Sequence, residues 1–138
     1  MPLYQRAFGG VLSLNPCAGA PTISSVTASS ITDPVCDTTG WTTRCTVSLS
    51  GSLGGQWELK LYTAIDSGGT AFNFWKRTTS LQEDRTTFTG QFGVGGPGPN
   101  TTRWMRFRAE VVPVGTDTVC DGPEDSNQLS KTEPSCQA

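Results

Sequence analysis

Apolar and polar residues alternate with a period of two in every part of this chain where apolar residues concentrate. The alternation is clearest between Arg103 and Val112, where it places four apolar side chains on one face: Met105, Phe107, Ala109 and Val111. Shorter runs with the same period occupy residues 45–49, 57–62 and 85–93, and FNFWKRTT (residues 72–79) supplies another expected strand. Because successive side chains of a β-strand point to opposite faces, each run predicts a strand, and no segment sustains a helical period.

Segments rich in glycine, proline, serine and aspartate separate these runs. They lie at residues 51–55, 65–70, 93–100 and 114–125, and they carry the residue types that set tight turns. The composition agrees, because 16 Gly, 9 Pro, 35% hydrophobic and 16% charged residues suit short strands joined by turns. In 138 residues, this pattern predicts one antiparallel β-sandwich of about seven strands.

Two stretches near the C-terminus carry a family resemblance. MRFRAEVVPVG (residues 105–115) followed by DSNQLSKTEPS (residues 125–135) resembles the last two strands of a fibronectin type III or related immunoglobulin-like domain. PTISSVTAS and WELKLY are similar to its first and third strands. The chain departs from the family pattern at Met105, where an aromatic is usual, and in CTVSLSGS, which lacks a tryptophan that Trp41 or Trp57 is expected to replace. The resemblance implies an all-β immunoglobulin-like (fibronectin type III-like) sandwich over residues 21–138, which leaves residues 1–20 as an extended N-terminal arm.

The connectivity that this resemblance implies assigns the five cysteines to the two ends of the sandwich. Cys17 and Cys120 fall at one end, and Cys36, Cys45 and Cys136 fall at the other. We therefore predict the disulfides Cys17–Cys120 and Cys36–Cys45, with Cys136 unpaired. A Cys120–Cys136 bond is disfavoured, because the strand between them would separate its ends by about 20–30 Å, against the ~5.5 Å that a disulfide spans. Five reduced cysteines are the alternative.

The side-chain inventory argues against an enzyme and against a bound cofactor. The absence of histidine removes the usual general base, every Ser–His or Cys–His nucleophile pair and the commonest transition-metal ligand. The cysteines form no CxxC pair, so a zinc site is not expected. An acidic cluster could hold calcium through Asp117, Asp121, Glu124 and Asp125, although a solvated loop is the favoured interpretation.

Two groups of residues are the candidate binding positions. Trp104 and Arg106 alternate outward on the strongest predicted strand, and Trp75 is expected beside them; aromatics mixed with arginine are enriched at the centres of protein interfaces. In the alternative interpretation, both tryptophans pack at the edges of the core. The second group lies in the arm and comprises Tyr4, Phe8 and Leu12. The net charge of −2 favours neither nucleic acid nor a membrane as a partner.

Two functions from different classes are consistent with these expectations. The chain starts at Met1 without a recognisable secretory signal, whereas its cysteines suggest an oxidising environment. A virion structural protein, namely a capsid decoration (cement) or tail-associated protein of a tailed bacteriophage, would reconcile the two, because it is made in the cytoplasm and oxidised after lysis. Its partners would be other virion proteins or copies of itself. The alternative is a secreted, extracellular adhesion or carbohydrate-binding module that contacts a surface glycan.

Overall fold

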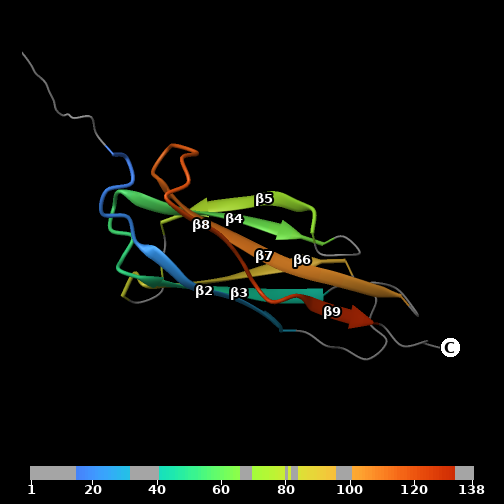
Figure 1. Ribbon diagram of the computed structural model, residues 1–138. Coiled ribbons are helices and arrows are strands. Elements are labelled where there is room, and N and C mark those ends of the chain that lie inside the picture. The colour runs from blue at the N-terminus through green and yellow to red at the C-terminus, as the bar shows by residue number, and fades with distance from the viewer. Residues whose placement is uncertain are drawn as a thin grey trace, which may run out of the picture.

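All regular structure in the described part of the chain is β-strand. The computed structural model describes residues 15–31, 41–65, 70–79, 81, 84–95 and 101–132. Eight strands follow one another along these residues (Figure 1): β2 (Thr22–Ser30), β3 (Trp41–Ser50), β4 (Trp57–Ala64), β5 (Phe72–Thr78), β6 (Thr87–Val94), β7 (Thr102–Pro113), β8 (Asp121–Asp125) and β9 (Leu129–Thr132). Each run with a period of two in the sequence coincides largely with one of these strands.

The strands form two antiparallel sheets that pack face to face. One sheet has the order β2-β3-β6, and the other has the order β5-β4-β7, with β8 and β9 both pairing along β7. The chain crosses between the sheets after β3, after β5 and after β6. This arrangement confirms the predicted fold class, an all-β antiparallel sandwich, in which β2, β3 and β6 face β4, β7 and β9.

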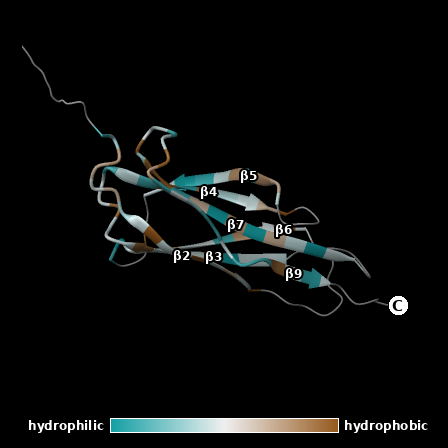
Figure 2. Ribbon diagram, in the orientation of Figure 1, coloured by the Kyte–Doolittle hydropathy of each residue, from teal (hydrophilic) through white to brown (hydrophobic). Residues whose placement is uncertain are grey.

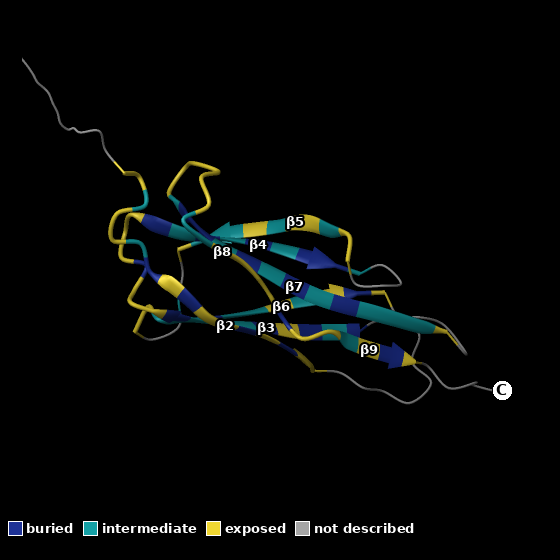
Figure 3. Cartoon of the chain, viewed as in Figure 1, coloured by how far each residue is buried: buried dark blue, intermediate teal, exposed yellow. Residues whose placement is uncertain are grey.

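The core lies between the sheets and consists of the inward rows that the alternation predicts. On β7 the residues Met105, Phe107, Ala109 and Val111 are all 0% exposed, and the residues between them are half-buried. Figure 3 shows this alternation along β7, and Figure 2 shows the matching alternation of hydropathy. The expected replacement for the missing tryptophan is also found, because Trp41 is completely buried and donates its Nε1–H to Ser30 Oγ at 3.1 Å.

The disulfide predicted between Cys17 and Cys120 is present and closes one end of the sandwich. Its Cα atoms lie 5.1 Å apart across a sequence separation of 103 residues. The bond joins the segment before β2 to the connection between β7 and β8. Residues 15–20, the last part of the predicted arm, are thereby attached to the sandwich, and Ala20 packs against the core. Residues 1–14 lie outside the described residues.

The predicted Cys36–Cys45 disulfide is wrong, because Cys45 is a free thiol buried between the sheets. Strand β3 begins at Trp41, so Cys45 is not the end of a turn but part of the inward row of the strand. Burial raises the pKa of the Cys45 thiol to about 12. The side chain therefore acts as a small apolar core residue. Cys36 and Cys136 lie outside the described residues.

Two polar side chains from the end of the chain hold the free edge of β2. Asp121 Oδ2 accepts the Ile23 N–H at 2.7 Å. Asn127 makes two bonds to one residue, since its Oδ1 accepts the Ala28 N–H at 2.8 Å and its Nδ2 donates to the Ala28 carbonyl oxygen at 3.0 Å. These contacts take the place of a neighbouring strand, so β2 is held on both of its edges.

Candidate interaction surface

The outer face of the five-stranded sheet carries several charged and aromatic side chains of the described strands. Cross-strand neighbours form rows, of which one contains Glu110, Lys60 and Arg77 and the next contains Arg108, Tyr62 and Phe74. The outer face of the other sheet instead carries mainly threonine and serine, with the exposed Arg44 as its charged residue. The two faces of the sandwich therefore offer different chemistry to a partner.

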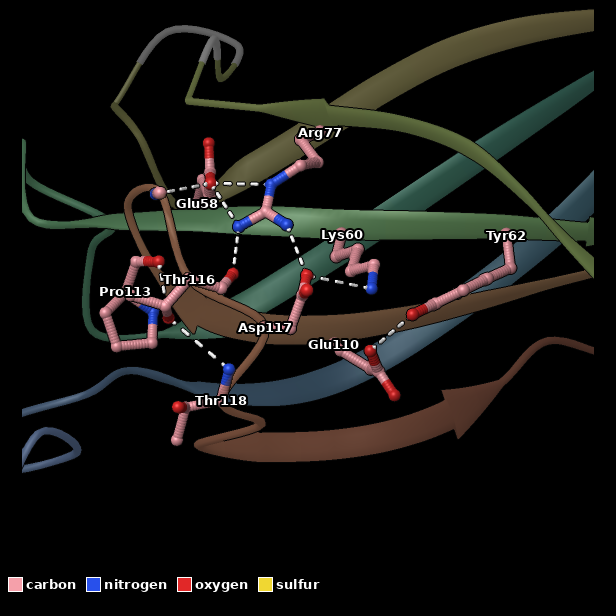
Figure 4. Close-up of polar contacts among 10 residues, drawn as sticks. Glu58, Lys60, Tyr62, Arg77, Glu110, Pro113, Thr116, Asp117 and Thr118 are labelled. Atoms are coloured by element: carbon pink, nitrogen blue, oxygen red, sulfur yellow. Dashed lines mark hydrogen bonds and ion pairs between the residues drawn. The ribbon is translucent and has the colours of Figure 1, made fainter.

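One half of the five-stranded face is an ion-pair network (Figure 4). Glu58 Oε1 accepts from Arg77 Nε at 2.7 Å and from the Gly115 N–H at 3.1 Å. Arg77 Nη1 and Lys60 Nζ both bind Asp117 Oδ1, at 2.8 and 3.1 Å, and Arg77 also donates to the Thr116 carbonyl oxygen. The network ties the connection between β7 and β8 to strands β4 and β5.

These contacts fix the charge states of the network. Hydrogen bonds from Lys60 and Arg77 lower the pKa of Asp117, and the hydrogen bond with Glu58 raises the pKa of Arg77. The hydrogen bonds of Lys60 with Tyr62 and Asp117 raise the pKa of Lys60, while burial raises the pKa of the Tyr62 phenol, which donates to Glu110 Oε1 at 2.8 Å. These shifts keep Asp117, Lys60 and Arg77 charged and the Tyr62 phenol neutral at neutral pH. This half of the face is consequently an internally compensated structural network.

The other half of the face is an aromatic–arginine patch, formed by Phe72, Phe74, Trp104, Arg106 and Arg108. Phe74 is the most exposed large hydrophobic residue of the described chain, at 56%, and its ring packs edge-on against Tyr62 at 6.4 Å. Arg108 lies over the Phe72 ring at 4.0 Å and binds Asp125 through two hydrogen bonds of 2.7 and 3.1 Å. The Arg108 guanidinium is therefore already stacked on Phe72 and paired with Asp125 within the chain itself.

Arg106 differs from its neighbour Arg108 because its charge has no acidic partner among the described residues. Its Nε is buried and makes no hydrogen bond, and none of the ion pairs within the described ranges includes it. Trp104 lies on the same outward row of β7, half-buried. The predicted outward orientation of Trp104 and Arg106 thus agrees with the structure.

The expected outward position of Trp75 is wrong. Its ring packs into the sandwich, with centroids 5.4 Å from both Phe92 and Phe107 and 6.5 Å from Phe88. Two features explain the reversal. The pairing of β4 with β5 shifts register between Leu61 and Tyr62, which changes the face of the residues that follow. Gly90 on β6 also leaves room for the rings, since a Cβ there would lie 2.6 Å from Phe88 Cζ and 3.2 Å from Trp75 Cη2.

Sequence reasoning missed Phe72 and Phe74 as members of the outer face, whereas the period of two in residues 57–62 correctly places Tyr62 there. The run FNFWKRTT alternates apolar and polar residues poorly, and nothing in it marks the position of the bulge. The pairing of Phe74 with Tyr62 across the strands is what places Phe74 on the outer face. The arm residues Tyr4, Phe8 and Leu12 lie outside the described residues.

The acidic cluster considered as a calcium site is dispersed among separate partners. Asp117 binds Lys60 and Arg77, Asp121 accepts the Ile23 N–H, and Asp125 binds Arg108. In the ranges that the structure covers, no group of three or more acidic or cysteine side chains is arranged to hold a metal ion. Within those same ranges, no helix is long and apolar enough to cross a membrane.

Among the described residues, the five-stranded sheet face therefore presents aromatic rings together with the guanidinium of Arg106, which has no acidic partner there. Aromatic rings and a guanidinium are groups that can stack and form charge-assisted hydrogen bonds. No protein-family model matches the chain, and no curated protein is significantly similar to it in sequence.

Proposed function

We propose that this chain is a binding module that resembles a fibronectin type III domain and acts through protein–protein contacts as a structural component of a bacteriophage particle. The role would be that of a capsid decoration or tail-associated protein. The observation that carries the binding role is the aromatic–arginine patch on the five-stranded sheet, where Phe74 is exposed and Arg106 has no described acidic partner.

The composition of the patch favours a protein partner. Burying exposed aromatic rings removes apolar area from water, and arginine at the centre of an interface pairs with carboxylates on the other side. Arg108 is already held by Asp125 and Phe72, so little side-chain entropy is lost when it is covered. We expect the partner to present carboxylates opposite Arg106 and an apolar groove or ring opposite Phe74.

The covalent chemistry supports a particle that leaves the cell. The Cys17–Cys120 bond stabilises the sandwich under oxidising conditions, whereas the buried Cys45 needs no partner in either environment. The fold is held by two sheets and a core of its own, so the disulfide can form after folding, when a cytoplasmic product is exposed to oxidant. The arm residues Tyr4, Phe8 and Leu12 supply a second region for contact with a neighbouring subunit.

The first experiment asks where the protein resides. Particles purified from a culture of the source should contain the chain in many copies, measured by mass spectrometry and by antibody labelling in electron micrographs. Its presence only as a free or cell-surface protein that binds defined glycans on an array would instead establish the adhesion or carbohydrate-binding alternative.

The second experiment asks which residues attach the protein. The substitutions Phe74→Ser and Arg106→Glu should each reduce occupancy on particles about tenfold or more, as for hot-spot residues. Arg44→Glu, a matched charge reversal on the opposite face, should leave occupancy unchanged. Deletion of residues 2–14, which leaves Cys17 in place, should also release the protein if the arm docks on a neighbour. Full occupancy of the Phe74→Ser, Arg106→Glu and deletion variants would refute attachment by these regions.

A further inference from the structure

Strand β6 is the edge of a sheet and pairs with β3 alone among the described strands. The Leu49 N–H donates to the Thr86 carbonyl oxygen at 2.8 Å, which sets the direction of the backbone groups along β6. Phe88, Gly90, Phe92 and Val94 turn their N–H and C=O groups toward β3. The backbone groups that face the free edge belong to Thr87, Thr89, Gln91 and Gly93.

Every other sheet edge in the described structure carries a device that discourages pairing with another chain. The edge of β2 is occupied by Asp121 and Asn127, and β5 has a register shift together with Lys76 and Arg77. Strand β8 contains Pro123 and three carboxylates, and β9 is only four residues long. Charges, proline, bulges and short length are the means by which natural proteins protect sheet edges.

Strand β6 has none of these protections. Its eight residues, TFTGQFGV, contain no charged residue and no proline, and its pairing with β3 has no register shift. Gln91 and Gly93 are exposed, and Phe92 is half-buried, with its ring against that of Trp75. Such an edge is a template for an additional strand.

The geometry points to a second copy of this chain as the occupant, with the two β6 strands paired antiparallel about a two-fold axis. Two identical edges can pair in this arrangement, because the hydrogen-bond pattern of an antiparallel pair is symmetric about a two-fold axis. The same surface of each copy then forms the contact, and an uncharged edge brings no like charges together. The two three-stranded sheets would become one continuous six-stranded sheet. This inference concerns copies of the chain and does not depend on the proposed function.

Only every second residue of β6 points its N–H and C=O groups toward the free edge, and this limits the register that the pair can adopt. The residues whose groups face the edge must be opposite one another, so the most extensive overlap places Thr89 opposite Gln91 of the second copy and Thr87 opposite Gly93. This register brings Phe88 of each copy opposite Phe92 of the other, a favourable aromatic pair across the strands. Gly90 meets its own counterpart on the axis, where no side chain obstructs the approach.

Electrostatics on the outer face of the sheet do not oppose this contact, while on the inner side Lys76 of β5 lies 5.7 Å from the Phe88 ring centroid. Arg44 is the charged residue on the outer face of the described β2-β3-β6 sheet, and it lies on β3, one strand away from the edge. In the pair, the two Arg44 residues would be separated by three strand spacings, roughly 14 Å. That separation exceeds the screening length of about 8 Å at physiological salt, so their repulsion is weak.

Sedimentation equilibrium of the full chain over a wide concentration range tests the proposal. We expect a reversible monomer–dimer equilibrium for the native chain. The double substitution Thr89→Lys and Gln91→Lys places lysine opposite lysine on the edge and should raise the dissociation constant by about tenfold or more. The control Ser25→Lys and Thr27→Lys adds the same charge to the same face on β2 and should change it by less than about twofold. A chain that stays monomeric throughout, or a control that abolishes the dimer equally, overturns the proposal.

Amide hydrogen exchange supplies a readout that does not depend on the folding of a variant. In the native chain, protection of the Thr89 and Gln91 N–H groups should rise with protein concentration. Protection that is strong and independent of concentration would mean that another segment of the same chain covers the edge, which overturns the proposal. The variant lacking residues 2–14 should still dimerise. Loss of its dimer would assign the edge to the arm and would equally overturn pairing between β6 strands.

Discussion

At the scale of single residues, the alternation along β7 separates positions that stabilise the fold from positions that contact a partner. Phe107 is fully buried and packs against Trp75 and Phe92, whereas Arg106, its neighbour in sequence, points to the opposite face. Adjacent residues of one strand therefore have different roles. This separation makes stability and binding measurable independently.

Substitution of Phe107 by alanine should lower the free energy of unfolding by about 3–5 kcal/mol, because it removes a buried ring and leaves a cavity. Arg106→Ala should lower it by less than about 1 kcal/mol, since that side chain lies on the outer face. Denaturant unfolding followed by tryptophan fluorescence measures both. Equal sensitivity of the two positions would contradict the assignment of the two faces.

The buried thiol of Cys45 should make stability depend on pH in the alkaline range. Burial raises the pKa of Cys45 to about 12, from an ordinary value of 9.0. Well below pH 9 the thiol is protonated in both the folded and the unfolded state and has no effect on stability. As the pH rises from about 9 toward 12, the unfolded chain gains stability by losing the proton, so the folded state becomes progressively less stable.

The comparison that isolates this effect is the native chain against Cys45→Ala. The substitution changes stability at all pH values by altering packing, but it removes the titrating group. We expect the difference in unfolding free energy between the two proteins to shift in favour of Cys45→Ala above pH 9. A constant difference between pH 7 and pH 10.5 would show that the thiol is not buried as described.

At the scale of elements, strand β2 depends on a side chain as well as on its neighbour β3. Asn127 satisfies both backbone groups of Ala28 on the edge that faces away from β3. Its amide is complementary to the donor and acceptor of one extended residue, as a strand would be. A side chain from the connection between β8 and β9 thereby makes the hydrogen bonds that a neighbouring strand would otherwise make.

Substitution of Asn127 by alanine should cost about 1–3 kcal/mol of unfolding free energy, because it leaves two partly buried backbone groups without partners. Amide exchange at Ala28 should also accelerate. Ser130→Ala, on the exposed face of β9, is the control and should have little effect on either measurement. If amide exchange at Ala28 were unaffected by Asn127→Ala, the clamp would not exist in solution.

At the scale of the whole molecule, one disulfide links the start of the sandwich to the connection before β8. Because Cys17 and Cys120 are 103 residues apart in sequence, the bond restricts nearly the whole unfolded chain. Their replacement by serine should lower the unfolding free energy by roughly 2–5 kcal/mol. The structure retains a full core without the bond, so we expect the variant to fold at room temperature.

Peptide mapping without reduction checks the connectivity directly. The oxidised protein should yield a peptide that contains Cys17 linked to Cys120. Alkylation should reach Cys45 only after denaturation, since its side chain is inaccessible in the folded state. A link between Cys45 and any other cysteine would contradict the structure.

The sequence alone determined the architecture and one covalent bond. The period of two between Met105 and Val111 depends only on the geometry of a strand and the need to bury one face, so it holds without knowledge of neighbours. The Cys17–Cys120 pairing followed from the connectivity implied by the family resemblance. The alternation depends on local strand geometry, and the disulfide depends on the order of the strands along the chain.

The tertiary structure alone decided which side chains meet. Cys45 was expected to pair with Cys36 at one end of the sandwich but is a free thiol in the inward row of β3, because the strand begins at Trp41. The segment at β8 was expected to be a turn, since Gly122 and Pro123 disfavour strands, yet it pairs with β7 at a sheet edge where a register shift tolerates both. Trp75 turned inward to fill the space over Gly90. Bulges, edges and vacant volume arise from pairs of strands distant in sequence, so no local pattern could reveal them.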